Sequence, residues 1–155
     1  MGYVYGTQIW GAVWNDYAEM RQVKDETIKP GRCVIETGDG DLILSTERLQ
    51  DGGEIISDTY GFCIGQTETA KTPIATTGRV LAYPYENIEV LRKAIGKPVS
   101  TGPDGTISLM SNEEAKMYPW KIIGTISEIP SYDTWKAGEK NQDINVDGRI
   151  WIRIR

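Results

Sequence analysis

The sequence Ile150-Trp151-Ile152-Arg153-Ile154-Arg155, at the end of the chain, decides the fold class. It alternates strictly, so that Ile150, Ile152 and Ile154 share one face while Trp151, Arg153 and Arg155 share the other. A period of two residues is that of a β-strand with one buried face. We therefore expect a mainly β protein, and we look for further strands of this kind along the chain.

A degenerate repeat extends the strand pattern over most of the sequence. The copies begin at 28–34 and 94–99, each with a Lys-Pro pair and a short apolar run. Further blocks match in the same order: 37–40 with 101–105, 42–45 with 107–111, 61–65 with 121–126, and 77–83 with 147–153. We interpret this as duplication of one small β unit, because two copies are too few for a solenoid.

The expected organisation is a single compact antiparallel β domain over residues 1–155. It comprises an N-terminal segment (1–24), β unit one (28–83), a linking helix (86–95) and β unit two (94–155). Asp-Gly pairs at 39–40, 104–105 and 147–148 supply the positive φ that tight hairpin turns need. Residues 131–146 are polar and indicate a long surface loop.

Two short connecting helices are predicted near 86–95 and 111–117. The first places Ile88, Leu91 and Ile95 on one face, with acidic residues early and basic residues late. The second begins with Ser111-x-x-Glu114, which has the spacing of a capping box, and Pro119 ends it.

Composition excludes several classes of function. The chain of 155 residues carries a formal charge of −5, which would repel a nucleic acid. No apolar run approaches the roughly 20 residues of a membrane span, and the start lacks the features of a signal peptide. With no histidine, a Ser-His-Asp triad and an imidazole zinc site are impossible. We expect no metal and no cofactor, and we read Cys33 and Cys63 as small buried hydrophobic residues.

One polar cluster lies among large aromatic residues. Asn15-Asp16-Tyr17-Ala18-Glu19 places an amide and two carboxylates together. It could be a polar edge after a strand. Alternatively, burial by aromatics would raise the pKa of a carboxyl group and make it a useful base, so Asp16 and Glu19, with Asn15 adjacent, are the candidate catalytic residues.

The aromatic residues themselves indicate a contact face. Five Trp and eight Tyr stand against one Phe, a balance that suits partly buried surfaces between subunits or against sugars, but also an ordinary core of large residues. Trp10 and Trp14 share a face whether the segment is extended or helical. The candidate oligomer or binding face therefore consists of Trp10, Trp14, Tyr17 and Trp151.

The run from Trp10 to Glu19, Trp-Gly-Ala-Val-Trp-Asn-Asp-Tyr-Ala-Glu, resembles the opening of C-terminal domains found on phage neck-appendage and tail-fibre proteins. Its Asp-Tyr-Ala-Glu core, residues 16–19, is similar to the start of the autoproteolytic intramolecular chaperone domains of peptidase family G2. Residues 44–49, 78–85, 123–130 and 148–153 also resemble pieces of such phage proteins. The likeness covers nearly the whole chain.

The resemblance implies a homotrimeric module at the end of a virion tail fibre or appendage, assembled in the host cytoplasm. Such a domain helps three chains find register, since early trimerisation raises the effective concentration of the upstream segments. In that family it then cuts itself from the upstream fibre segment of the same polypeptide, near its own start, which makes it at most a single-turnover autoprotease. Asp16 and Glu19 would be the catalytic carboxylates.

Two other hypotheses stay open. A non-cleaving virion module, either a fibre tip or a capsid decoration, would use exposed Trp and Tyr to hold a host glycan or another virion protein. A free-standing hydrolase is the third hypothesis, although no catalytic constellation supports it. Aromatics buried between subunits favour the chaperone, and an open aromatic groove favours the binding module.

Overall fold

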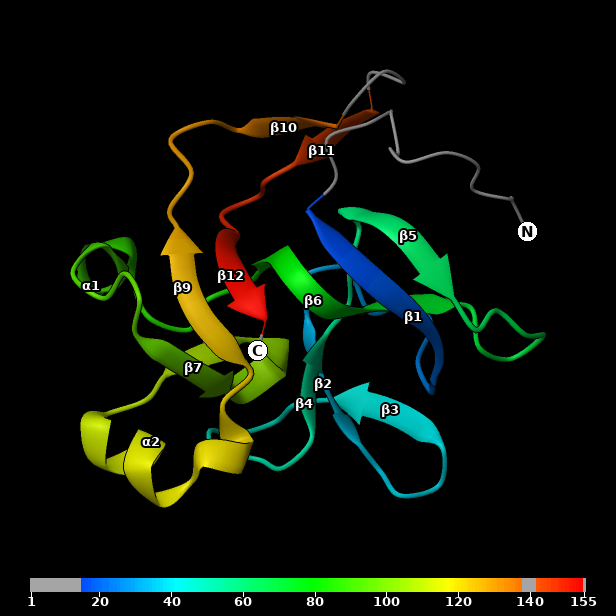
Figure 1. The fold of residues 1–155 in the computed structure, drawn as a ribbon, viewed down its shortest axis with the longest axis horizontal. Coiled ribbons are helices and arrows are strands. Elements are labelled where there is room, and N and C mark those ends of the chain that lie inside the picture. Colours follow the sequence, from blue (N-terminus) through cyan, green and yellow to red (C-terminus); the bar gives the residue numbers. More distant parts are fainter. Residues whose placement is uncertain (1–14, 138–141, 155) are drawn as a thin grey trace, which may run out of the picture.

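The computed structural model describes residues 15–137 and 142–154, which form a mainly β structure (Figure 1). The strands are β1 (Asp16–Val23), β2 (Cys33–Glu36), β3 (Asp41–Leu44), β4 (Gly53–Ile55), β5 (Tyr60–Ile64), β6 (Thr72–Ala82), β7 (Pro98–Thr101), β8 (Ile107–Leu109), β9 (Gly124–Glu128), β10 (Thr134–Ala137), β11 (Gln142–Asn145) and β12 (Ile150–Ile154). The helices are α1 (Ile88–Arg92) and α2 (Asn112–Met117), and 3-10 turns lie at Pro103–Gly105 and Pro119–Lys121. The predicted fold class is confirmed.

Most strands belong to one curled sheet. Its order is β4-β2-β3-β1-β6-β12-β9-β7-β8, and β5 pairs in addition with the first half of β1. Figure 1 shows β6 and β12 in the middle, with β2, β3 and β4 toward one side and β7 and β9 toward the other. The β10–β11 hairpin stands apart at one end.

The registers of the hairpins show the duplication. Val34 faces Leu44 across β2–β3, as Val99 faces Leu109 across β7–β8. The matching last strands, β6 and β12, pair antiparallel at the centre, with Leu81 facing Trp151, Val80 facing Ile152 and Ala82 facing Ile150. In the repeat, Val80 corresponds to Ile150 and Ala82 corresponds to Ile152. In the sheet, each of these residues faces the counterpart of the other. A local two-fold axis through the Leu81–Trp151 pair therefore relates the two strands.

One block of the repeat was matched wrongly from the sequence. The sequence matches residues 61–65, which include most of β5, with residues 121–126, which include the start of β9. The hydrogen-bond pattern shows instead that β9 corresponds to β4 together with Ile56. Gly31 and Arg32 bond the backbone of Ile56 as Gly96 and Lys97 bond the backbone of Ile126. The two sequence blocks share only an apolar run beside a glycine, which is too little to fix a strand's partner.

Trp151 is a core residue, which corrects its assignment to a contact face. Its side chain is 0% exposed and packs with Leu81 and Val146, while Ile150 and Ile152 enter the larger core on the opposite side of the strand. The Trp135 ring lies edge-on 5.3 Å from the Trp151 ring, and the indole Nε1 donates to the Tyr132 hydroxyl at 2.8 Å. Both faces of β12 are therefore covered at this end.

The covering element was missed because 131–146 reads as a polar loop. These residues contain the β10–β11 hairpin, in which Trp135 faces Ile144 and both pack toward Trp151. Two apolar side chains placed opposite each other are enough to dock a short hairpin. The following Asp147–Gly148 turn leads into β12, which pairs with β6 and β9, so this Asp-Gly pair does not close a hairpin.

Both helices lie where the sequence predicts them. Asn87 caps α1, and Ser111 and Glu114 form the capping box of α2. On α1 the face is less buried than expected: Leu91 is buried, but Ile95 is 52% exposed. Cys33 is buried, whereas Cys63 is only partly covered. Within the described residues, no helix has the length and apolar composition that a membrane crossing requires.

Candidate functional site at the start of β1

Asp16, the first residue of β1, is a buried acid with an incomplete set of partners. Its side chain is 5% exposed, and its Oδ1 accepts a 2.6 Å hydrogen bond from the Thr59 hydroxyl. Its Oδ2 is also buried and has no hydrogen-bond partner within the described chain. Burial raises the pKa of Asp16 to about 6, against the smaller lowering effect of the Thr59 and Ser57 hydroxyls.

The irregular start of β1 turns Asp16 inward. β1 runs between β5 and β6, and its register shifts after Asp16 on the β5 side and after Tyr17 on the β6 side. Such irregularities redirect side chains and are frequent beside functional sites. Here Asp16 and Ala18 are buried, whereas Tyr17 and Glu19 are exposed.

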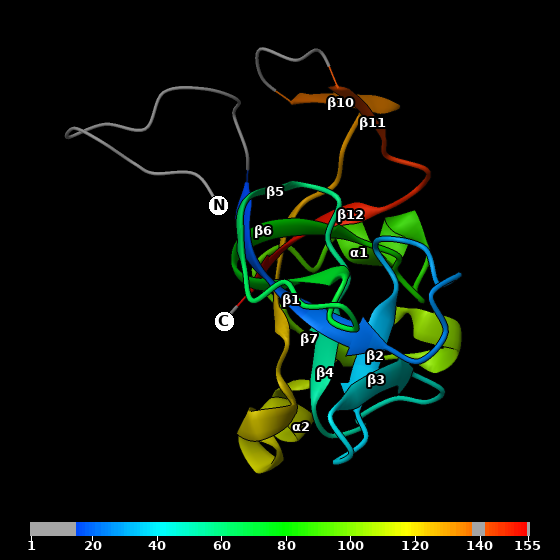
Figure 2. The same ribbon diagram turned by 90° about the vertical axis from the view of Figure 1, so that its right-hand side faces the viewer.

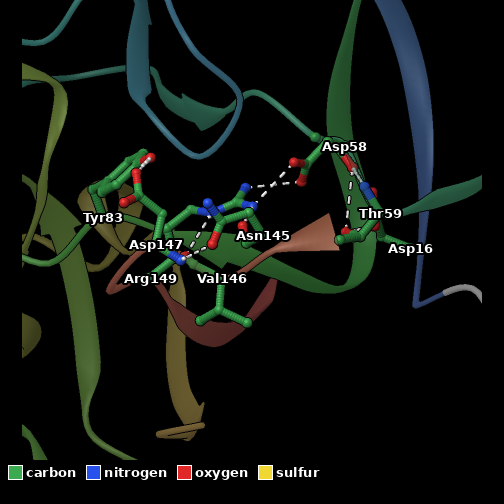
Figure 3. A network of polar contacts seen from close by, with 9 residues as sticks. Asp16, Asp58, Thr59, Tyr83, Asn145, Val146, Asp147 and Arg149 are labelled. Carbon is green, nitrogen blue, oxygen red and sulfur yellow. Dashed lines mark hydrogen bonds and ion pairs between the residues drawn. The ribbon is translucent and has the colours of Figure 1, made fainter. Parts of the chain in front are cut away.

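A short polar loop supports the carboxyl group from behind. Ser57 Oγ accepts from the Thr59 amide at 3.1 Å and lies 3.5 Å from the Thr59 hydroxyl. Both side chains are buried, so Ser57, Thr59 and Asp16 form a chain of polar groups with little exposure to bulk solvent. In Figure 3, Thr59 and Asp16 lie on one side of this loop, and Asp58 turns the other way toward Arg149.

Arg149 anchors the same loop. Its guanidinium forms a two-pronged ion pair with Asp58, at 2.8 and 3.0 Å, and it also donates to the backbone carbonyls of Asn145 and Val146 (Figure 3). Gly31 makes room for this side chain, since a Cβ there would lie 2.4 Å from Arg149 Cδ. A two-pronged pair fixes orientation as well as distance, so Arg149 holds the loop that places Thr59 against Asp16.

The backbone that enters the site is also held. The amide of Asn15 donates to the Thr59 carbonyl at 3.2 Å, and the Asn15 carbonyl accepts from the Arg79 amide at 2.6 Å. Gly78 permits this approach because a Cβ there would lie 2.3 Å from the Asn15 oxygen. The backbone at the junction of Asn15 and Asp16 is therefore held on both sides.

The predicted site residues are thus only partly brought together. Asn15 contributes its backbone, and Glu19 lies on the exposed side of β1, where no hydrogen bond or ion pair joins it to Asp16 in the described chain. Tyr17 is 54% exposed and meets Phe62 of β5 edge-on at 6.1 Å. Trp10 and Trp14 lie outside the described residues.

The sequence interpretation missed Ser57, Asp58, Thr59 and Arg149. One signal was present: the polar triplet 57–59 directly follows the buried pair Ile55 and Ile56. Polar side chains that directly follow a buried strand tend to be buried in the fold themselves, and buried polar groups need hydrogen-bond partners. Which partners it finds depends on tertiary structure, because Thr59 lies 43 residues from Asp16 and Asp58 lies 91 residues from Arg149.

A pocket of about 260 Å³ opens beside Arg149. Its lining mixes charges of both signs, including Lys29, Asp58 and Asp147, and the Tyr83 hydroxyl donates to Asp147 at 2.5 Å. Because the Arg149 donors already bind Asp58 and backbone carbonyls, the pocket offers no strong anion site. No set of acidic or cysteine side chains in the described residues is arranged to hold a metal ion.

A second acid with a raised pKa lies on β4. Burial, and then the charge of Glu36, raise the pKa of Glu54 to about 7. Arg21 of β1 binds Glu36 at 2.8 Å and reaches Glu54 at 3.4 Å. This cluster joins β1, β2 and β4, so we assign it to the structure of the sheet and not to the site at Asp16.

No known protein family matches the chain, and no curated protein or solved structure matches it either. The chemistry available at Asp16 therefore follows from its geometry alone. A buried carboxyl group with a pKa near neutrality can both take up and release a proton under physiological conditions.

Proposed function

We propose that this chain is the C-terminal assembly domain of a phage tail fibre or appendage, which trimerises and cuts its own polypeptide once on the N-terminal side of β1. The observation that carries the proposal is the Asp16 carboxyl group. It is buried, it has one unpartnered oxygen, and it lies where the upstream chain enters the domain. A buried acid without full pairing costs stability, which is typical of residues kept for chemistry.

The proposed reaction is hydrolysis of an upstream peptide bond. Asp16, ionised, takes a proton from a water molecule whose oxygen adds to the scissile carbonyl carbon. The carbon–nitrogen bond then breaks as Asp16 returns the proton to the departing nitrogen, leaving a carboxyl group and an amine. The Thr59 hydroxyl, donating to Oδ1, orients the carboxylate and leaves Oδ2 for the proton transfer.

Trimerisation is supported by an exposed apolar patch close to the site. Tyr17, Phe62 and Ile64 are 54%, 47% and 57% exposed on β1 and β5. β5 is also paired on one side only within the described chain, and such edges tend to pair with another chain. A contact here would gather three copies at the place where their upstream segments arrive.

The test is the intact mass of a precursor that carries about 100 additional upstream residues, the size of a small domain. We expect the precursor to split on the N-terminal side of β1, and we expect Asp16→Asn to stay whole. Glu19→Gln, on the exposed side of the same strand, is the matched control and should split normally. A wild-type precursor that stays whole would favour the non-cleaving virion module, and a cleaved Asp16→Asn precursor would exclude Asp16 as the catalytic group.

A further inference from the structure

An exposed aromatic corner lies far from Asp16. Trp120, in the 3-10 turn after α2, is 65% exposed, and its neighbour Met117 is 63% exposed. The Tyr118 ring stands perpendicular to the Trp120 ring, at 89° and 5.7 Å between centroids. Figures 1 and 2 both place α2 at the end of the molecule opposite to the start of β1, so this corner faces away from the point where an upstream fibre would join.

Polar contacts fix the orientation of both rings. The Trp120 indole Nε1 donates to Asp51 Oδ1 at 2.9 Å. Lys121 lies over the Tyr118 ring at 5.0 Å, donates to the Leu49 carbonyl at 2.7 Å and pairs with Asp51 at 3.6 Å. An exposed ring held in one orientation loses little entropy when it binds a ligand.

The surroundings of the corner carry too many charges for the centre of a stable protein interface. α2 buries none of its residues, and its neighbouring surface carries exposed Glu113 and Lys116. A stable protein contact needs about 800 Å² on each partner, with few charges at its centre. Two aromatic rings bordered by a carboxylate and an ammonium group suit instead a ligand with one apolar face and many hydroxyl groups.

We propose that Trp120, Tyr118 and Asp51 form a binding subsite for one pyranose ring of a glycan. The apolar C–H face of the sugar stacks on the Trp120 indole, and Tyr118 limits its position from the side. Asp51, whose side chain is 74% exposed, accepts hydrogen bonds from the sugar hydroxyls, with the Lys121 ammonium group beside it. The subsite is independent of Asp16, and it operates whether or not the chain is cut.

The experiment uses the whole chain and follows the indole N–H signals of tryptophan by NMR. The probes are chitotetraose and maltotetraose, added to about 10 mM because a single stacking subsite binds in the millimolar range. We expect the Trp120 signal to shift in a saturable manner with at least one of them, and Trp120→Ala to abolish sugar saturation-transfer signals. The unchanged Trp151 signal reports that the core of the variant is intact.

Tyr85→Ala is the matched control, since Tyr85 is another aromatic side chain with 58% exposure. It should bind the probes as the wild type does. Three results would overturn the proposal: no saturable shift with either oligosaccharide, an equal shift with glycerol at the same concentration, or equal loss of binding in both variants.

Discussion

Asp16 combines a feature that a purely structural acid would avoid with a firmly fixed position. It is buried with one oxygen unpaired, and yet Asp16 is held firmly by Thr59 and by the bulged start of β1. A purely structural acceptor for the Thr59 hydroxyl would be supplied equally well by an amide at this position. The unusual pKa of Asp16 therefore lends itself to a direct stability test.

Replacing Asp16 by Asn should make the free energy of unfolding less dependent on pH. The folded pKa of about 6 is above the ordinary 3.8, so folding favours the protonated acid. This contribution to stability is complete below pH 3.8 and is lost as the pH rises through about 6. We expect Asp16→Asn to flatten the stability curve in that window and to raise stability at pH 8 by up to about 2 kcal/mol.

Urea unfolding at pH 4, 6 and 8 measures this effect. The Asn oxygen can still accept the Thr59 hydrogen bond, so the substitution tests the charge and not the packing. A variant less stable than the wild type at pH 8 would mean that the Asp16 carboxylate is a stabilising group, contrary to our assignment.

Glu54 gives a second pH effect over a higher window. Its folded pKa of about 7 is above the ordinary 4.5, so its contribution is complete below pH 4.5 and is lost as the pH rises through about 7. Glu54→Gln should stabilise the fold at pH 8 by about 1 kcal/mol, because the amide can donate to Glu36 and removes one of two repelling charges. Thermal unfolding checks this against Glu68→Gln, an exposed control that should change nothing.

At the level of single residues, the sequence alone predicts Asp16 but not the residues that hold it in place. Asp16 attracts attention because acids and large aromatics crowd one short segment. Thr59 and Arg149 carry no comparable local signal, since each acquires its role from a partner dozens of residues away. Trp151 was misplaced for the same reason: the alternation of β12 predicts two faces but cannot reveal that a second hairpin covers the outer one.

Among the secondary-structure elements, the close contact between β6 and the start of β1 fixes the position of the Asn15 backbone. Gly78 has φ +95°, and a Cβ there would come within 2.3 Å of the Asn15 carbonyl. Gly78→Ala should therefore lower the free energy of unfolding by more than about 2 kcal/mol, from backbone strain and the clash together. It should also slow processing of the precursor, because the start of β1 must move.

Gly148→Ala is the control that measures the cost of a positive φ without a steric clash. Gly148 also has a positive φ, +75°, but no atom lies within 4 Å of the added Cβ. It should cost only about 1 kcal/mol. Urea midpoints that fall equally in the two variants would mean that the contact with Asn15 does not constrain the entering chain.

Hairpins and helices were more predictable than strand partners. Asp-Gly turns and the Ser111–Glu114 capping box are local signals, and β2–β3, β7–β8 and α2 follow them. The partners of β5 and β9 depend on which backbone groups meet across the sheet, which a short apolar run does not specify. The repeat was therefore recognised correctly while one of its blocks was aligned with the wrong strand.

On the scale of the whole molecule, the two units are interlocked. Arg149, directly before the last strand of unit two, pairs with Asp58 of unit one, and Arg79 of unit one pairs with Glu128 of unit two. β12 is also the neighbour of β6. The final strand thus completes the support of the loop behind Asp16, so the site can form only after the whole domain has folded. Cleavage that depends on this site would follow folding and not precede it.

The patch of Tyr17, Phe62 and Ile64 provides the test of assembly. In a three-fold fibre the upstream segments run together, so we expect residue 15 of each copy to lie toward the axis. The patch adjoins that residue, and we expect it to form the contact between copies. We expect the wild type to be a trimer by light scattering at micromolar concentration. The double variant Phe62→Asp, Ile64→Asp should be a folded monomer under the same conditions, because two buried unpaired charges per copy oppose association.

The matched control is Ile95→Asp, an equally exposed isoleucine at the end of the α1 region, which should stay trimeric. Circular dichroism establishes that both variants are folded. A wild-type monomer would remove the register-setting role altogether, whereas a trimer that survives the double variant would place the contact on another face. If the monomeric variant of the precursor still cuts itself, Asp16 acts within one chain. If cutting is lost with the trimer, assembly itself completes the site, and a fibre would be released only after its three chains have come into register.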